Sequence, residues 1–352
     1  MLNKSIIKQL IDKKGYLIAD GATGTNLFSM GLESGYPPEL WNIEAPQNVA
    51  ENHEKFIQAG ADIILTNSFG ANRHRLKLHK AENKTYEINY AAAEIAKNVT
   101  NNSKRNILVA GSVGPTGELI IPLGQLTKED TIETFYEQIK GLKDGGIDLI
   151  WIETMSAEEE MECAIIAAKK NNLPIICTYS FDTHGKSMMG LEPKSLARLA
   201  EKYYPDVIGY GANCGIGASE LIGTIICLAN ERINEDMLLI AKGNCGIPEF
   251  IEGKIAYTGT PELMAEYASL ARAIGADIIG GCCGTKYEHI VAMRDALRNK
   301  SQSQIIDLDA ITQSLGKMSA GNTALIDGYL NPNKKIKPSV KKKMRRRKKR
   351  PD

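Results

Sequence analysis

Residues 237–284 read MLLIAKGNCGIPEFIEGKIAYTGTPELMAEYASLARAIGADIIGGCCG. This stretch joins two short apolar runs through a helical segment. The first run (237–246) ends in Gly-Asn-Cys-Gly, and the second (276–284) ends in Gly-Gly-Cys-Cys-Gly. Continuous apolar runs are typical of parallel strands buried on both faces. Between them, 261–275 has helical apolar spacing and ends at a glycine, a common helix stop. The stretch therefore predicts a strand–helix–strand unit.

The same alternation recurs along most of the chain. Six further apolar runs lie at 15–22, 61–69, 106–114, 148–154, 174–181 and 206–214. Helical patterns at 48–60 and 130–141 also end at glycine. Eight strands alternating with helices predict an α/β fold of the (β/α)8 TIM-barrel type. The alternative is an open doubly wound sheet, but the loop DGATGT (20–25) lacks its usual GxGxxG pattern.

Three segments are expected. The barrel would cover residues 1–300, and a C-terminal extension packing on it would cover 301–333, with one helix near 305–315 and order fading beyond about Gly321. Residues 334–352 form a basic tail, with 12 Lys and Arg and no acidic residue between 334 and 350. Such a one-sign, weakly hydrophobic segment is predicted to be disordered.

Composition indicates a globular cytoplasmic protein. Hydrophobic residues make up 43% and charged residues 24% of the chain, and no run approaches the ~18 apolar residues of a membrane span. Residues 1–15 resemble a short amphipathic helix rather than a signal peptide. The seven cysteines are odd in number, so reduced thiols are expected instead of a disulfide framework.

Three cysteines are expected at the end of the barrel where functional residues stand, after the strands. Cys214 follows one predicted strand, and Cys282 with Cys283 follows another. Thiolates are soft ligands that favour zinc, and a catalytic zinc commonly has three protein ligands and one open position. From the residues alone, a metal site and simple packing of thiols both stay open. Cys245 could be a fourth ligand, a neighbouring thiol or a packing residue.

Two acids are expected on the same rim. Asp20 and Glu153 each end a predicted strand, and either could be a structural hydrogen-bond acceptor. Together they suit an ammonium group, while backbone N–H groups of the loop GATGT (21–25) could bind a carboxylate. Ammonium, carboxylate and thiol sites together indicate an amino-acid thiol as the ligand.

The motifs DGATGT (20–25), GANCG (211–215) and GGCCGT (280–285) together resemble the homocysteine S-methyltransferase family, over roughly residues 15 to 300. The resemblance implies a barrel enzyme that forms methionine, with Zn²⁺ held by Cys214, Cys282 and Cys283. It implies that homocysteine is held by Asp20 and Glu153, the catalytic acids, together with Gly21, Ala22, Thr23 and Asn213. Three further segments, 110–118, 180–190 and 242–250, are similar to bacterial betaine–homocysteine S-methyltransferases.

The resemblance implies an onium methyl donor, with glycine betaine favoured over the sulfonium donors S-methylmethionine and dimethylsulfoniopropionate. Such donors leave as neutral molecules and are usually held against aromatic faces. Trp41 matches a donor-site tryptophan of the animal enzymes, whereas Gly70 and Thr154 replace two tyrosines of that site. The predicted aromatic wall comprises Trp41, Phe69, Tyr179 and Phe181.

Expected partners are therefore two small molecules, with a homo-oligomer possible. A function of a different class, RNA binding through KKKMRRRKKR (341–350), remains the alternative. That tail has no aromatic residue for base stacking, so a solvated tail is favoured.

Overall fold

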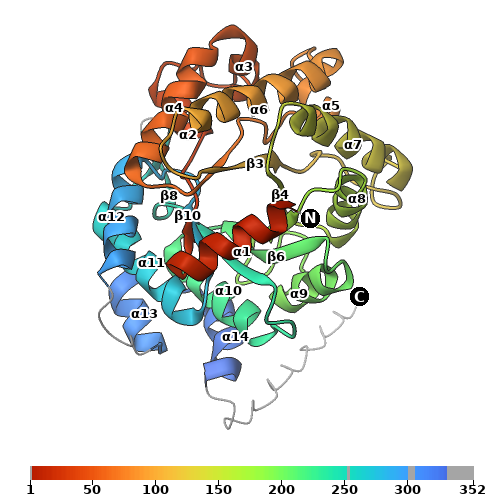
Figure 1. The fold of residues 1–352 in the computed structure, drawn as a ribbon. Helices are drawn as coiled ribbons and strands as arrows, with labels where there is room; N and C mark the ends of the chain where they lie inside the picture. The colour runs from red at the N-terminus through yellow and green to blue at the C-terminus, as the bar shows by residue number, and fades with distance from the viewer. Residues whose placement is uncertain (1, 252–253, 300–305, 331–352) are drawn as a thin grey trace, which may run out of the picture.

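A computed structural model describes residues 2–251, 254–299 and 306–330. Its centre is a sheet of eight parallel strands in the order β1-β10-β7-β6-β5-β4-β3-β2. A parallel bridge between Ala19 and Ile63 joins the two edges, so the sheet closes into the predicted barrel (Figure 1). The strands are β1 (Leu17–Ile18), β2 (Ile63–Leu65), β3 (Leu108–Val113), β4 (Leu149–Met155), β5 (Ile175–Tyr179), β6 (Val207–Cys214), β7 (Leu238–Gly243) and β10 (Ile278–Gly281).

Helices surround this barrel in a ring (Figure 1). They are α4 (Pro46–Ala59), α6 (Thr85–Asn101), α7 (Lys128–Asp144), α8 (Glu158–Lys169), α9 (Pro193–Lys202), α10 (Ala218–Asn230), α11 (Pro261–Ile274) and α12 (Tyr287–Arg298). Shorter elements occupy the connections: α2 (Gly24–Ser29), η1 (Pro38–Leu40), α3 (Trp41–Glu44), α5 (Arg73–Lys77), η2 (Glu82–Lys84) and the hairpin β8 (Pro248–Ile251) with β9 (Lys254–Tyr257).

The predicted glycine stops are correct for two helices and wrong for a third. Gly60 and Gly275 cap α4 and α11 in the left-handed region, with φ of 119° and 108°. Helix α7 instead continues past Gly141 to Asp144. A Cβ at Gly141 would lie 2.7 Å from the Tyr86 carbonyl oxygen, so this glycine lets α7 approach α6 closely.

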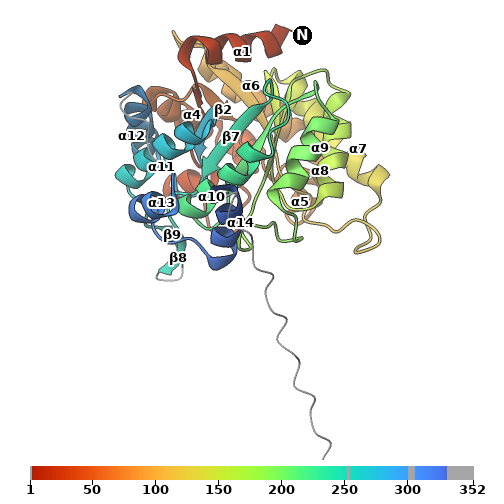
Figure 2. The same cartoon turned by 90° about the horizontal axis from the view of Figure 1, so that it is seen from below.

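Helix α1 (Leu2–Lys14), the predicted N-terminal helix, covers one end of the barrel. Ile7 of α1 is buried in a cluster with Leu17, Trp151 and other side chains of the strands. Figure 2 shows α1 across one end of the molecule and the β8–β9 hairpin at the other. Because α1 closes the end where the strands begin, a site at the opposite end is the one open to ligands.

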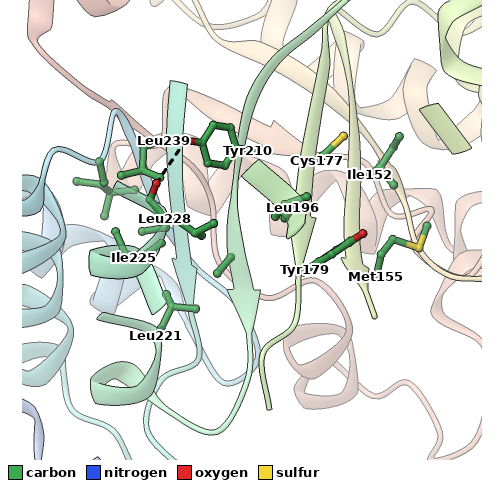
Figure 3. Close-up of a cluster of buried hydrophobic side chains, with 14 of the residues drawn as sticks. Ile152, Met155, Cys177, Tyr179, Leu196, Tyr210, Leu221, Ile225, Leu228 and Leu239 are labelled. Atoms are coloured by element: carbon green, nitrogen blue, oxygen red, sulfur yellow. Dashed lines mark hydrogen bonds between the residues drawn. The ribbon is translucent and has the colours of Figure 1, made fainter. Parts of the chain in front are cut away.

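The layer between strands and helices forms the main core. Figure 3 shows part of it, where Tyr179 of β5 lies with Met155 and Leu196 among buried apolar side chains. Tyr210 donates a hydrogen bond to the Leu228 carbonyl at 3.4 Å in the same region. Within the described ranges, no helix is long and apolar enough to cross a membrane.

Two C-terminal helices pack outside the ring. Helix α13 (Leu308–Leu315) contacts α11 and α10, and α14 (Ala320–Leu330) contacts α10. The expectation that order fades beyond Gly321 is therefore wrong, because Asn322 and Ile326 are buried and hold α14 in place. Residues 301–305 and the basic tail (334–352), predicted to be disordered, lie outside the described residues.

Asn322→Ala is expected to lower the free energy of unfolding by about 1–3 kcal/mol, because it removes buried hydrogen bonds. The Asn322 Nδ2 donates to the backbone carbonyl and the Oε2 of Glu220, both at 2.8 Å. Chemical denaturation followed by circular dichroism measures the change. The exposed Asn83→Ala is the matched control and should change little. Equal stability of the two variants would contradict the assigned role of Asn322.

Candidate active site

A pocket of about 610 Å³ opens where the barrel strands end. One side is formed by strand ends and includes Glu153, Cys214, Lys242, Cys282 and Cys283. The other side, which we call the loop wall, is formed by the connections after β1 and β2: Phe28, Tyr36, Glu39, Phe69, Gly70, Arg75 and His79. Pockets of about 300–1,000 Å³ hold drug-sized ligands, so two small substrates fit together.

The three cysteines at the strand ends form one cluster. Their Sγ atoms all lie within 4.8 Å of one another, and those of Cys214 and Cys283 are 3.9 Å apart. Cys214, the last residue of β6, has a φ of 63°, while the Cys282 N–H donates to the Gly243 carbonyl at 2.6 Å. Hydrogen bonds from Cys214 and Cys282 lower the pKa of the Cys283 thiol. Of the three thiols, Cys283 therefore loses its proton most readily, because the pKa of Cys214 and that of Cys282 are raised.

The other cysteines lie outside this cluster. The Cys245 Sγ donates to the Gly259 carbonyl oxygen at 3.2 Å. Cys163, Cys177 and Cys227 are buried in the main core, as expected for packing thiols. Across the three described ranges, Cys214, Cys282 and Cys283 are the single group of His, Cys, Asp or Glu side chains arranged to hold a metal ion.

Asn213 connects two strand ends instead of lining the pocket. Its Oδ1 accepts from the Thr154 N–H at 2.8 Å, and its Nδ2 donates to the Thr154 Oγ1 at 2.6 Å. The Nδ2 also lies 3.9 Å from the Cys282 Sγ. Thr154 has a φ of 62°, a strained value for a β-branched residue. Asn213 therefore holds the β4 end in this conformation and orients one thiol.

The two predicted acids have different environments. Glu153 lines the pocket, and its Oε1 accepts from the Ser112 Oγ at 2.5 Å. Asp20 is buried and is not part of the pocket wall. Its Oδ2 accepts from the Leu65 N–H at 2.8 Å, and burial raises the Asp20 pKa to about 7, partly offset by Lys242.

Lys242 is a pocket residue that the sequence analysis missed. Its side chain is only 4% exposed, and its Nζ lies 3.6 Å from the Asp20 Oδ1 and 3.4 Å from the Gly21 carbonyl oxygen. The nearby charges of Asp20, Cys282 and Glu153 raise its pKa against the effect of burial, so the ammonium stays charged. The sequence feature that could have identified Lys242 is its position within the apolar run LLIAKG. A lysine in a buried strand almost always has a partner, so such a position indicates a site residue.

Gly21, Ala22 and Thr23, which the resemblance assigned to homocysteine binding, line the pocket. The Ala22 N–H donates to the Thr285 carbonyl at 3.0 Å. A Cβ at Gly21 would lie 2.6 Å from that same carbonyl, so only glycine fits there. The loop is thus packed tightly on the segment after β10, and one of its N–H groups is already occupied.

Of the four predicted aromatic residues, the structure brings only Phe69 to the pocket. Trp41 packs against a separate cluster that contains Leu27, and Tyr179 points from the barrel into the main core. Phe181 packs on Tyr179, with ring centroids 5.9 Å apart. Side chains alternate across a strand, and on β5 the outward position falls on Tyr179. The aromatic residues of the wall are instead Phe28, Tyr36 and Phe69.

A closed (β/α)8 barrel with three thiols and a carboxylate around one pocket at the strand ends defines a barrel enzyme with a thiol-rich active site. A sequence profile described as "Homocysteine S-methyltransferase" matches residues 17–297. The chain therefore belongs to the homocysteine S-methyltransferase family.

Individual relatives agree with this assignment. The methionine synthase of Mycobacterium leprae is 27% identical over 295 residues, which cover 78% of this chain but only 24% of that protein. This chain thus spans about a quarter of that relative's length. The metallated form of the homocysteine methyltransferase MmuM from Escherichia coli superposes with a TM-score of 0.68 at 23% identity, covering 82% of this chain and 99% of that one. Its oxidized form superposes with a TM-score of 0.67 at 24% identity, covering 82% of this chain and 98% of that one. These structures support the fold.

Proposed function

We propose that this enzyme transfers a methyl group from a small onium donor, with glycine betaine favoured, to the sulfur of homocysteine, forming methionine. The observation that carries the proposal is the group of three Sγ atoms within 4.8 Å of one another, beside Glu153 and Lys242 in one pocket. Sulfur ligands for a metal, a carboxylate for an ammonium group and space for a second small molecule meet there.

The cysteine cluster fits zinc. Zn–S bonds of about 2.3 Å in a tetrahedral site require sulfur–sulfur separations of about 3.8 Å. The Cys214 and Cys283 Sγ atoms are 3.9 Å apart, and Cys282 lies within 4.8 Å of both. These three residues would hold the ion, with Asn213 orienting the Cys282 thiol. When bound, zinc would hold the homocysteine thiol as a thiolate, the form that attacks carbon.

Homocysteine would lie between Glu153 and the first loop. Glu153 supplies a buried negative charge for the substrate ammonium, and Ser112 keeps its carboxylate oriented. Gly21, Ala22 and Thr23 line the space beside it. Burial strengthens the attraction between carboxylate and ammonium, because water screens it less there than at the surface. These contacts would direct the thiol toward the three cysteines.

The loop wall suits a donor that carries both a positive and a negative group. Phe28, Tyr36 and Phe69 offer aromatic faces, and Glu39 offers a carboxylate, to an onium centre. The Arg75 guanidinium lies over the Phe69 ring at 5.5 Å from its centroid. In the part of the chain that the structure describes, no ion pair or side-chain hydrogen bond occupies that guanidinium. Arg75 opposes the burial-raised pKa of Glu39 and Glu160, so it lies near both carboxylates, and its N–H donors would bind the carboxylate of the donor.

The reaction balances without a further reactant. The homocysteine thiolate donates an electron pair to the donor methyl carbon, and the bond from that carbon to the onium nitrogen or sulfur breaks. Its electron pair stays on the departing group, so betaine leaves as dimethylglycine. The positive charge of the onium centre is cancelled by the thiolate, and the thioether of methionine is neutral.

Arg75→Met is expected to raise the KM for carboxylate-bearing donors about 10- to 100-fold, because it removes a charge-assisted hydrogen bond. Zinc-loaded protein and homocysteine would be incubated with glycine betaine, S-methylmethionine, dimethylsulfoniopropionate or trimethylsulfonium, and methionine would be quantified. Trimethylsulfonium has no carboxylate, so its KM should not change. Arg73→Met is the matched control, because Arg73 pairs with Glu137 outside the pocket. Failure of every donor with the wild-type protein would overturn the proposed function.

A further inference from the structure

Among the described residues, the buried ammonium of Lys242 has two long contacts with protein oxygens. Its Nζ carries three N–H donors, but the Asp20 Oδ1 at 3.6 Å and the Gly21 carbonyl oxygen at 3.4 Å lie beyond ordinary hydrogen-bond length. The Asp20 Oδ1 likewise has no hydrogen-bond partner among the described residues. A buried charge is costly to leave with N–H donors that lack a close acceptor, so a ligand that offers an acceptor here would be bound strongly.

Lys242 lines the pocket, whereas Asp20 does not. Lys242 and Glu153 both line the pocket together with the three cysteines, whereas Asp20 is absent from its wall. Asp20 is buried behind other groups, with its Oδ2 accepting from the Leu65 N–H and its Oδ1 3.6 Å from the Lys242 Nζ. On the strand-end side of the pocket, a ligand therefore meets the ammonium of Lys242, the carboxylate of Glu153 and the thiol cluster, while Glu39 and Arg75 belong to the loop wall.

This charge pattern matches an α-amino acid with a thiol. The ammonium would pair with Glu153 and the sulfur would reach the cysteines, which leaves the carboxylate near Lys242. The first loop is a weaker candidate for that carboxylate, because the Ala22 N–H already donates to Thr285. We propose that Lys242 binds the carboxylate of homocysteine and that Asp20 is a positioning residue for Lys242. This inference rests on the proposed function and refines its substrate contacts.

Two thiol substrates distinguish binding of the carboxylate from binding of the ammonium and the thiol. The first is homocysteine, and the second is 3-aminopropane-1-thiol, which keeps the ammonium and thiol but lacks the carboxylate. Lys242→Met is expected to raise the KM for homocysteine about 10- to 100-fold and to change that for 3-aminopropane-1-thiol less than about threefold. Lys202→Met is the matched control, since Lys202 is an exposed residue paired with Glu162. An equal loss with both thiols, or no loss with either, would overturn the assignment of Lys242.

Asp20→Asn distinguishes positioning from contact. If Asp20 acts through Lys242, Asp20→Asn should weaken the binding of homocysteine but not that of 3-aminopropane-1-thiol. Adding Lys242→Met to Asp20→Asn should then cause little further loss of homocysteine affinity, as expected for residues that act as a unit. If Asp20 instead contacts the substrate ammonium directly, Asp20→Asn should weaken the binding of both thiol substrates, and that result would overturn the positioning role. The double variant also removes both buried charges, so it guards against misfolding caused by one unpaired charge.

A binding measurement makes the test independent of methyl transfer. Isothermal titration with L-methionine, which has the carboxylate and ammonium but no free thiol, should show a dissociation constant about 10- to 100-fold higher for Lys242→Met than for wild type. An unchanged constant would overturn the inference. If wild-type protein binds methionine but forms none from any donor, the proposed function fails while the role of Lys242 is still decided.

Discussion

Cys283→Ala is expected to abolish metal binding and to reduce methyl transfer to homocysteine by about 10³-fold or more, since metal-ion activation contributes several kcal/mol to such reactions. The Cys283 Sγ lies 3.9 Å from that of Cys214, and its pKa is the one lowered by the neighbouring thiols. Its loss leaves two sulfur atoms, too few for the three protein ligands typical of catalytic zinc. Without the metal, a free thiol with a pKa of ~8.5 is only a few per cent thiolate at neutral pH.

Metal analysis after dialysis provides the measurement. Wild-type protein should retain about one zinc per chain, and Cys283→Ala should retain less than about a tenth of that. Cys245→Ala is the informative comparison, because the Cys245 thiol donates to the Gly259 carbonyl and lies outside the cluster. It should keep its zinc. Full zinc and full activity in Cys283→Ala would show that the three sulfurs do not bind the ion.

The barrel could be predicted because its signals are local and repeated. Each strand is an apolar run of a few residues, and helices at regular spacing separate the runs. Once that alternation is recognised, the fold determines which end of each strand carries the functional groups. Residues as distant in sequence as Cys214 and Cys283 can then be expected in one place, and the structure brings their sulfurs to 3.9 Å.

The donor wall could not be predicted in the same way. Whether Tyr179 or Thr178 faces the barrel interior depends on a register that shifts by one residue, and the sequence run PIICTYSF is compatible with both. The structure directs Thr178 toward Trp151 and Tyr179 toward the core. Phe28 lies in the short helix α2 and Tyr36 in the turn after it, and no periodic pattern specifies the path of this connection.

Lys242 was missed for another reason. Its neighbours in sequence are apolar, and the groups that explain it, Asp20 and Glu153, come from β-strand ends that are far away in the chain. A charged residue inside a buried strand run is therefore worth treating as a site residue even when its partners are unknown. The same logic identifies Glu153, which follows four apolar residues near the end of β4.

Glu153→Gln is expected to lower kcat/KM for homocysteine by about 30- to 3,000-fold, mainly through KM, because truncating one partner of a buried charge pair costs about 2–5 kcal/mol. Glutamine keeps the size of the side chain and can still accept the hydrogen bond from Ser112. The negative charge that attracts the substrate ammonium is the feature that disappears. Glu159→Gln, on an exposed position of α8, is the matched control.

Substrate truncation and pH provide two independent readouts of Glu153. 4-Sulfanylbutanoate keeps the thiol and carboxylate of homocysteine but has no ammonium, so its KM should be the same in wild type and Glu153→Gln. Burial raises the pKa of Glu153, with Lys242 opposing the rise, so the carboxylate gains its proton at a higher pH than an exposed glutamate would. The wild-type kcat/KM for homocysteine should therefore fall as pH decreases through that pKa, and the part of this acidic limb that Glu153 contributes should be absent in Glu153→Gln, leaving the part due to Asp20. A variant that loses activity equally with both thiols, and keeps the whole acidic limb, would show that Glu153 supports the barrel and does not bind the ammonium.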